Sequence, residues 1–476
     1  MPLILPGNVG SATAATGFNV ANSLRFDRGS TDFLNKTLGT PTNVDKATFS
    51  TWVKFTDTSS GNDATLFGVL ADGNNTTYIQ LLGSKVIRLN MRESTNYIGV
   101  LTTNRVFRDP SAWYHIVVAF DTTQGTDSNR IKLYINGVQE TSFSTATYPS
   151  QNTDLRFNTS GQVFNIGRRG DSVNLLDGYL AETVFIDGQQ LEPDQFGEFD
   201  EDSGIWKPIN VSGLTFGNNG FYLDYEDSGN LGNDKNGGTD LTVNNLTALD
   251  QSIDTCTNNF ATMNPLSADE MTFSNGNLDV DQASSGPRSD DNARGTIGVN
   301  SGKWYWETKL TGATAPCVVG ICFDELKMGS DLSGSTGVYA IQNASATYAY
   351  RRENGTSAET SGFPNPVANN IMNVAFDADN GKLYLGINGT YYNQAGATGN
   401  PATGSNATFS SIDTSFFWLP WIESRGDNQQ ALMNFGSGTS YSISSGNADG
   451  EGYGNFEYSV PSGYYSLCTK NLAEYG

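Results

Sequence analysis

The chain has 476 residues, with 27 Lys and Arg against 50 Asp and Glu, so its formal net charge is −23. This acidity argues against nucleic acid or an anionic membrane surface as a partner, because both are bound through basic patches. The single histidine and the four cysteines, which form no CxxC pair, exclude His-rich zinc sites and argue against a disulfide framework or a histidine-dependent catalytic centre.

Residues 1–20 are mostly small and apolar and are interrupted by Pro2, Pro6, Gly7, Gly10 and Gly17. Prolines and glycines disfavour an amphipathic helix, and the segment lacks the basic start of a secretory signal peptide. No apolar run of about 18 residues occurs in the sequence, so no transmembrane helix is expected. The segment could stay disordered or lie extended against a partner and add a strand to it, and our hypothesis is that it docks.

The predicted elements that follow are short strands. Apolar and polar side chains alternate with a period of two over residues 48–55, 113–121 and 130–135, and again over 303–310, 318–323 and 382–387. Gly, Asn, Asp and Ser fill the segments between them, and capped amphipathic helical patterns are nearly absent. This pattern predicts an all-β fold built from antiparallel sandwiches.

One motif occurs in both halves of the chain. Residues 117–121 read VVAFD and are followed by KLYING at 132–137, while residues 373–377 read NVAFD and are followed by KLYLGING at 382–389. Each copy predicts a buried strand, then a second strand that ends at Asn-Gly, the pair that suits a type I′ hairpin turn. The simplest interpretation is two separate sandwiches, each with this hairpin.

The domain boundaries follow from these elements and from composition. We predict an arm at 1–20, a first sandwich at 21–200, a Gly-, Asn- and Asp-rich connector at 201–255 and a second sandwich at 256–476. The predicted fold is therefore two tandem antiparallel jelly-roll-like β-sandwiches joined by this connector.

The connector also holds the best candidates for a metal site. Hard oxygen ligands are plentiful there, so the metal would be calcium, held by Asp224, Asp227, Asp234, Asn236 and Asp240. The spacing departs from an EF-hand loop, and the alternative is a solvated stretch of Asx turns. No cofactor is required by the rest of the sequence.

The sequence favours neither the histidine nor the acidic run as a catalytic group. His115 lies inside the predicted strand 113–121, where a packed or hydrogen-bonded side chain is the simpler interpretation. A glycosidase would need a pair of carboxyl groups. The run Glu198-Phe199-Asp200 begins such a pattern, but Ser203 breaks it, and a solvated turn fits better. We expect no enzymatic activity.

Aromatic side chains in loop-rich stretches are the candidates for ligand contact, since a ring face can stack on the apolar face of a sugar. These candidates are Tyr97, Tyr348, Tyr350, Tyr391 and Tyr392. The alternating pair Trp304 and Trp306 is expected in the core. The tripeptide RGD at 169–171 is read as a turn.

Both halves resemble known families. The first half is similar to laminin-G-like, concanavalin-like domains through SLRF at 23–26, FSTWVKF at 49–55, the pair 113–120 and 133–137, and the closing segment 166–187. The second half resembles the SPRY sandwich through SGKWYWETKL at 301–310, VGI at 319–321, the segment 376–389 and NFG at 434–436. Both resemblances imply a fold and leave the ligand open.

The order of the segments resembles virion structural proteins of tailed phages, particularly marine ones. The stretches that carry this resemblance are 176–208, 216–227, 244–250 and 258–266. It implies a virion surface protein of the tail-fibre or adhesin type, assembled in the host cytoplasm, that binds a glycan or another envelope component of the host cell. The arm would attach it to other virion proteins, and a homo-oligomer, by analogy a trimer, would display several weak sites together.

The sequence is compatible with two other functions. A capsid decoration or head-fibre protein would have a mainly structural role, and copy number on the particle would distinguish it. A polysaccharide-degrading enzyme would need carboxylates brought together from different strands, which the sequence does not mark.

Overall fold

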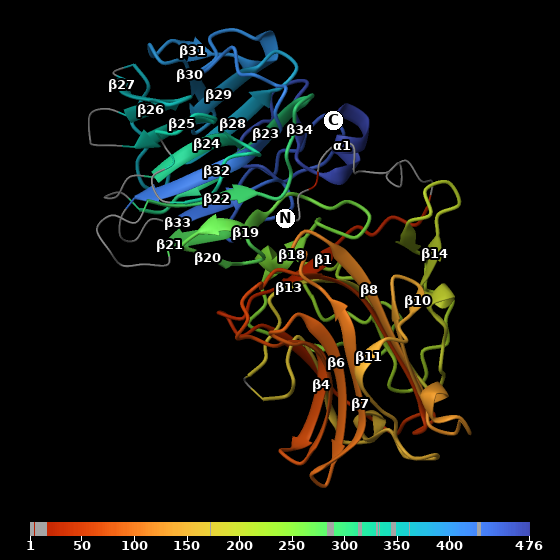
Figure 1. Ribbon diagram of the computed structural model, residues 1–476. Coiled ribbons are helices and arrows are strands. Elements are labelled where there is room, and N and C mark those ends of the chain that lie inside the picture. The colour runs from red at the N-terminus through yellow and green to blue at the C-terminus, as the bar shows by residue number, and fades with distance from the viewer. Residues whose placement is uncertain are drawn as a thin grey trace. The chain divides into compact units, whose positions relative to one another are not determined.

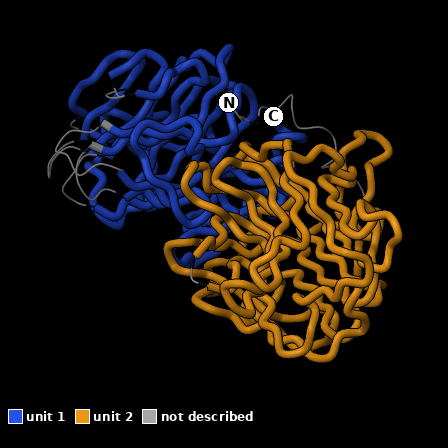
Figure 2. The backbone as a smooth tube through the Cα atoms, turned by 60° about the horizontal axis from the view of Figure 1, so that its bottom comes forward, with its two compact units in different colours: residues 1–14, 258–476 blue, residues 15–257 orange. Residues whose placement is uncertain are grey.

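The computed structural model describes residues 4, 17–171, 173–282, 290–312, 317–329, 332, 334–343, 349–360, 362–425 and 430–476. The chain forms two compact units, 15–257 and 1–14 together with 258–476 (Figure 2). Each is a β-sandwich of mainly antiparallel sheets, and we call them the first and the second sandwich. Within the described ranges, no helix has the length and apolar character that crossing a membrane requires.

Two large sheets face each other in the first sandwich. Sheet 1 has the order β10 (Val138–Gln139), β9 (Ile131–Ile135), β8 (Trp113–Asp121), β3 (Lys46–Phe55), β13 (Gly178–Asp187), β1 (Ser23–Phe26) and β18 (Gln251–Ser252), with β16 (Phe221–Leu223) beside β13. Sheet 2 has the order β11 (Phe143–Thr147), β7 (Asn96–Val106), β6 (Val86–Glu93), β5 (Asn75–Leu81), β4 (Ala64–Asp72), β12 (Val163–Ile166), β2 (Phe33–Thr37) and β17 (Thr242–Asn244). A small hairpin pairs β14 (Gly197–Phe199) with β15 (Trp206–Pro208).

The second sandwich also has two sheets. One has the order β19 (Met263–Asp269), β22 (Asp290–Gly295), β32 (Trp418–Arg425), β24 (Cys317–Phe323), β25 (Val338–Asn343), β26 (Ala349–Glu353) and β27 (Thr356–Thr360). The other has the order β20 (Met271–Ser274), β21 (Asp279–Gln282), β33 (Gln430–Asn434), β23 (Lys303–Leu310), β28 (Ile371–Asp377), β29 (Lys382–Ile387), β30 (Thr390–Tyr392) and β31 (Thr398–Gly399), with β34 (Tyr465–Ser466) beside β23. Helices are short: α1 (Thr469–Tyr475) and the 3-10 turns Asp127–Asn129, Arg156–Asn158, Pro193–Gln195, Ala248–Asp250 and Pro401–Thr403.

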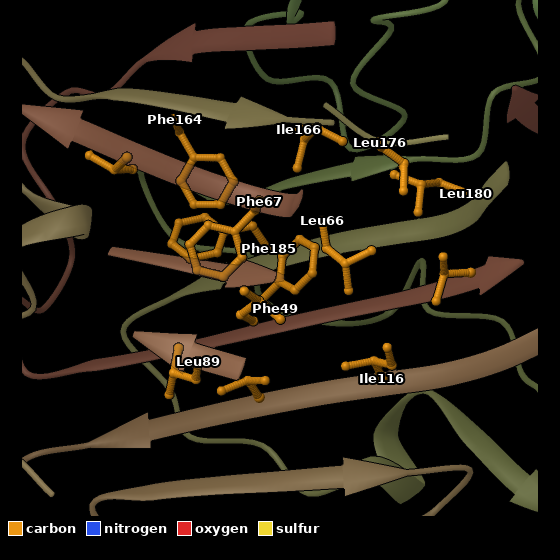
Figure 3. Close-up of a cluster of buried hydrophobic side chains, with 14 of the residues drawn as sticks. Phe49, Leu66, Phe67, Leu89, Ile116, Phe164, Ile166, Leu176, Leu180 and Phe185 are labelled. Atoms are coloured by element: carbon orange, nitrogen blue, oxygen red, sulfur yellow. The ribbon is translucent and has the colours of Figure 1, made fainter. Parts of the chain in front are cut away.

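Alternation of side chains places the core of the first sandwich between its two sheets. Phe49 of β3, Phe67 of β4 and Phe164 of β12 pack there, with ring centroids 4.8 Å apart for Phe49 and Phe67 (Figure 3). Because successive residues of a strand point to opposite faces, Trp52 and Lys54 of β3 point away from this core and need a second cover.

That cover comes from the segment expected to be a connector, and this corrects the predicted boundary at 201. Residues 201–255 belong to the first sandwich: β16 pairs with β13, β17 with β2 and β18 with β1. The outer face of sheet 1 is apolar, and Phe216 and Tyr222 pack on Val117 and Val184 there. The sequence did not predict this role, because the strands of this segment are only two or three residues long and so cannot show the two-residue alternation of a strand.

A buried ion pair fixes the end of this cover. Lys54 Nζ lies 2.7 Å from Asp254 Oδ2, and both side chains are fully buried. Trp113 Nε1 donates a hydrogen bond of 3.2 Å to the other carboxylate oxygen of Asp254. The pair ties residue 254 to a central strand of sheet 1.

The repeated hairpin has the predicted form in both sandwiches. Asn136 and Gly137 have φ of 48° and 78°, and Asn388 and Gly389 have φ of 49° and 83°, as a type I′ turn requires. These turns join β9 to β10 and β29 to β30. The buried strand that precedes each hairpin is β8 or β28, and β8, β23 and β29 have the expected bounds.

Only Ile4 and residues 17–20 of the predicted arm are described, and 1–3 and 5–16 lie outside the described residues. The amide of Ile4 donates to the carbonyl of Thr296 at 2.9 Å, and the amide of Gly298 donates to the carbonyl of Ile4 at 3.0 Å. Ile4 therefore adds a parallel bridge to the second sandwich of its own chain. Attachment of the arm to other proteins stays a prediction.

Candidate functional site

The outer face of sheet 2 gathers polar and aromatic side chains from strands β4 to β7, which lie side by side in Figure 1. On β5, Ile79 and Leu81 point into the core, so Tyr78 and Gln80 point outward. The face, which we call the polar face, consists of Tyr78, Gln80, Arg88, Asn90, Arg92, Tyr97, Asn165, Arg168 and Arg169.

The register of the strands brings these side chains together. Tyr78 is paired with Asn90 and Gln80 with Arg88 across β5 and β6. Arg92 is paired with Tyr97 across β6 and β7, and its guanidinium lies 5.5 Å from the centroid of that ring. Directly opposed residues have neighbouring side chains, so the face forms a continuous surface over three strands.

The loop after β12 covers one end of the polar face. A Cβ on Gly68 would lie 2.6 Å from the backbone of Arg169, so only glycine allows the loop to cross β4 this closely. The guanidinium of Arg169 lies 5.8 Å from the centroid of the Tyr78 ring. Arg168 stacks on Phe33 and donates from Nε to Asn165 Oδ1 at 2.9 Å.

Two side chains of this face carry buried polar atoms without hydrogen-bond partners in the described part of the chain. Asn90 is 1% exposed, and neither its amide nitrogen nor its amide oxygen has a partner. The Nε of Arg88 is buried and equally without one. Leaving a buried polar group unpaired costs about 1–3 kcal/mol. A ligand that reached these atoms would remove this cost by supplying the missing partners.

Other amides on the same face are paired, which sets Asn90 and Arg88 apart. Gln80 donates to Thr65 Oγ1 at 2.8 Å, and Asn165 donates to the carbonyls of Gly68 and Val163 at 3.1 and 3.0 Å. Burial raises the pKa of Tyr78, and Arg88 and Arg169 oppose that rise. Tyr78 therefore keeps its phenolic proton at neutral pH and can both donate and accept a hydrogen bond.

The aromatic candidates predicted from the sequence lie in different places. Tyr97 belongs to the polar face and is 56% exposed. Tyr350 is half-buried, Tyr392 is half-buried against Phe363, and Tyr348 lies outside the described residues. Tyr391 was expected in an exposed loop, but it is buried beside Tyr305 and Phe456. Its ring lies on the outer face of its sheet, where the segment around Phe456 covers it.

The calcium candidates are engaged with cations and amides of their own segment. Asp224 Oδ2 lies 2.7 Å from Lys235 Nζ. Asp234 accepts hydrogen bonds from the amides of Tyr222 and Asn236 at 3.0 and 3.1 Å.

The remaining candidates of this segment form turns as well. Asp227 accepts from the amide of Gly229 at 2.9 Å, and Asp240 accepts from the amide of Asp234 at 2.9 Å. Over the described ranges, no three His, Cys, Asp or Glu side chains gather as a metal-holding group. Calcium binding therefore stays a prediction.

His115 is a buried strand residue, as the sequence indicated. Its ring stacks on Trp52, with centroids 4.8 Å apart, and on Trp206, with centroids 5.9 Å apart. Ser50 Oγ lies 2.9 Å from Nε2. Burial lowers the pKa of His115 to about 3, so the ring is neutral at ordinary pH and serves packing.

The acidic run at Glu198 forms the predicted turn. Asp200 accepts hydrogen bonds from the amide and the hydroxyl of Ser203 at 2.9 and 2.8 Å. Lys207 Nζ lies 3.0 Å from Asp200 and 3.4 Å from Glu198. These contacts hold the turn between β14 and β15 and draw the carboxylates toward a lysine.

Of the side chains on the polar face, Tyr97 was named as a candidate from the sequence, and Tyr78, Arg88 and Asn90 were not. The available signal was the alternation of polar residues at 76, 78 and 80 and at 88, 90 and 92. That pattern is typical of any half-buried strand, so it could not mark a site without the fold.

Comparison with known proteins agrees with the architecture. Residues 28–195 match the Laminin_G_3 family, described as the Concanavalin A-like lectin/glucanases superfamily. Among curated proteins, none matches the chain.

Several solved structures are similar to parts of the chain, among them the following three. The SPRY domain of human HERC1 is 15% identical, with a TM-score of 0.28, over 36% of this chain and 96% of that one. The PSpry domain of TRIM65 is 13% identical, with a TM-score of 0.27, over 36% of this chain and 89% of that one. A heptameric SAP-like pentraxin from Limulus polyphemus is 15% identical, with a TM-score of 0.29, over 38% of this chain and 82% of that one.

Proposed function

We propose that the protein binds carbohydrate without cleaving it, through the polar face of the first sandwich. The observation that carries this proposal is the pair of buried, unpartnered groups, the Asn90 amide and the Arg88 Nε, beside Tyr78. Amide and guanidinium groups recognise sugar hydroxyls by hydrogen bonds, and a tyrosine ring offers a face for the C–H surface of a pyranose.

The family match supports the same proposal. The matched residues 28–195 contain β4 to β7 and β12, the strands and loop that build the polar face. The exposed Tyr97 ring extends the surface beyond Asn90. A shallow face of this kind suits weak binding at single sites, which gains strength when several copies are displayed together.

Binding of the purified full chain to an array of polysaccharides tests the proposal. We expect Tyr97→Ala to weaken binding at least about fivefold, since stacking on a ring contributes roughly 1 kcal/mol or more. Tyr350→Ala is the matched control, because it removes a half-buried tyrosine from the second sandwich. Loss of binding in the control with none in Tyr97→Ala would contradict the assignment of the site.

We further propose that the protein acts on the surface of a virion, as an adhesin for a host cell-surface glycan or other envelope component. The support is the resemblance of segments 176–208, 216–227, 244–250 and 258–266 to phage structural proteins. Proteomics and antibody labelling of purified particles test this: we expect a few copies at the tail. Hundreds of copies on the capsid would indicate a decoration protein, and absence from the particle would contradict both.

A further inference from the structure

We propose that the ligand of the polar face carries an anionic group, a carboxylate or sulfate ester, and is thus an acidic polysaccharide. This inference rests on the proposed carbohydrate binding and names the class of sugar. It starts from charge: the chain has a net charge of −23, yet four of its 27 basic residues, Arg88, Arg92, Arg168 and Arg169, gather on this one face.

Most of this positive charge is not neutralised within the described parts of the chain. Arg169 forms an ion pair with Asp171. Arg88, Arg92 and Arg168 form none with any described carboxylate: Arg92 donates to the backbone carbonyls of Thr95 and Gly73, and Arg168 donates to an amide. Asp171 also acts electrostatically on Arg168. Asp63 acts on Tyr78, but its effect on the pKa of Tyr78 is the smallest of those identified.

The unpartnered groups are suited to an anion. Arg88 and Asn90 are alternate residues of β6, so their side chains rise from the sheet about 7 Å apart along the strand. The Nε of Arg88 is a charged, buried donor, and charge-assisted hydrogen bonds to carboxylate or sulfate oxygens are roughly twice as strong as neutral ones. The Asn90 amide can donate to the same group or to a neighbouring hydroxyl, while the ring of Tyr78, paired with Asn90, lies beside the sugar.

The burial of these donor groups strengthens the preference for an anionic ligand. A donor withdrawn from water interacts more strongly with a charge than an exposed one does, because the effective dielectric constant is lower. A neutral sugar would satisfy the Asn90 amide but would offer no counter-charge to the Arg88 guanidinium, whose Nε is buried. The acidic remainder of the protein would repel a polyanion, so contact is expected to be confined to this face.

Titration calorimetry of the full chain with polygalacturonic acid, dextran sulfate and neutral dextran tests the proposal. We expect binding to at least one polyanion, none to dextran, and at least about a tenfold loss of affinity between about 50 and 500 mM NaCl, because salt screens charge. The carboxylate and sulfate polymers distinguish the two possible anionic groups.

Two substitutions locate the interaction. Arg88→Gln is expected to weaken polyanion binding at least about tenfold, whereas Lys132→Gln, which removes one positive charge from β9 in sheet 1, should change it less than about twofold. Thermal unfolding of both variants checks folding, and Arg92→Gln provides a second variant should Arg88→Gln unfold. Equal affinity for dextran and polygalacturonic acid, or no effect of Arg88→Gln and Arg92→Gln, would overturn the anionic ligand while leaving carbohydrate binding intact. Failure to bind any polysaccharide would overturn both proposals.

Discussion

The indole Nε1 of Trp206 donates a hydrogen bond to Nδ1 of His115 at 2.9 Å. This contact fixes the tautomer, because Nδ1 must accept and the ring proton therefore lies on Nε2, toward the Ser50 hydroxyl. The donor comes from β15, within the segment 201–255 that the sequence suggested was a connector. The single histidine of the chain thus holds the cover of sheet 1 in place.

Acid should weaken the first sandwich through His115. Its pKa in the fold is about 3, so as the pH falls below about 6.5 the unfolded chain binds a proton that the folded chain does not. The unfolding free energy should fall by up to about 1.4 kcal/mol per pH unit from that group, down to about pH 3. His115→Gln, which can still accept from Trp206, should lack this contribution. Urea titrations of both proteins at several pH values measure the difference, and parallel pH profiles would contradict the prediction.

Glu182 should make the first sandwich less stable as the pH rises, whereas His115 makes it less stable as the pH falls. It sits at a bulge of β13 with φ of 49°, and burial raises its pKa to about 8. As the pH rises from about 4.5 toward 8, the unfolded chain ionises this carboxyl while the folded chain keeps it neutral, so stability is lost.

The variant for comparison is Glu182→Gln. In the natural protein the Tyr222 hydroxyl donates a hydrogen bond of 2.6 Å to the carboxyl group of Glu182, and the amide oxygen of the glutamine can accept the same bond. This variant should gain stability over the natural protein by up to about 1.4 kcal/mol per pH unit across that window. Chemical unfolding at pH 5 and about pH 8 measures the gain. An equal difference in stability at the two pH values would be the contrary result.

Replacing Asn90 should abolish polysaccharide binding without lowering the stability of the fold. Asn90→Leu removes a buried amide without partners, so the unfolding free energy should stay unchanged or rise by about 1 kcal/mol, while polysaccharide binding is lost. Asn165→Leu is the matched control on the same face: it removes an amide that makes hydrogen bonds, and should cost about 1–3 kcal/mol. Urea unfolding measures both. Destabilisation of Asn90→Leu as large as that of the control would mean that Asn90 has a structural role.

The buried pair of Lys54 and Asp254 should be strongly non-additive. Lys54→Met leaves a carboxylate buried without its cation, which should cost about 3–5 kcal/mol. Combining it with Asp254→Leu removes both charges and should restore part of the loss. Double-mutant cycles in urea give the coupling energy. If the effects of the two substitutions simply add, the two charges interact weakly, and the pair contributes little to holding residues 201–255 on sheet 1.

Much of the fold was predictable from local patterns, and most of the site was not. Residues 113–121 and 382–387 show a period of two, and the Asn-Gly turns fix their own backbone geometry, so β8, β29 and both hairpins followed from the sequence. The role of Trp206 and the isolation of Asn90 depend on contacts made by segments far away in the chain, the cover of sheet 1 and the loop crossing at Gly68. No local pattern reports such contacts.

The first sandwich begins and ends at adjacent strands: β1 pairs with β18, and the amide of Val20 donates to Thr257 Oγ1 at 3.1 Å. Ile4, which precedes it, pairs with Ile297, which follows it. The ribosome therefore releases Ile4 before the whole first sandwich, and Ile297, its bridge partner in the second sandwich, only after it. This bridge can form only once the first sandwich has been translated.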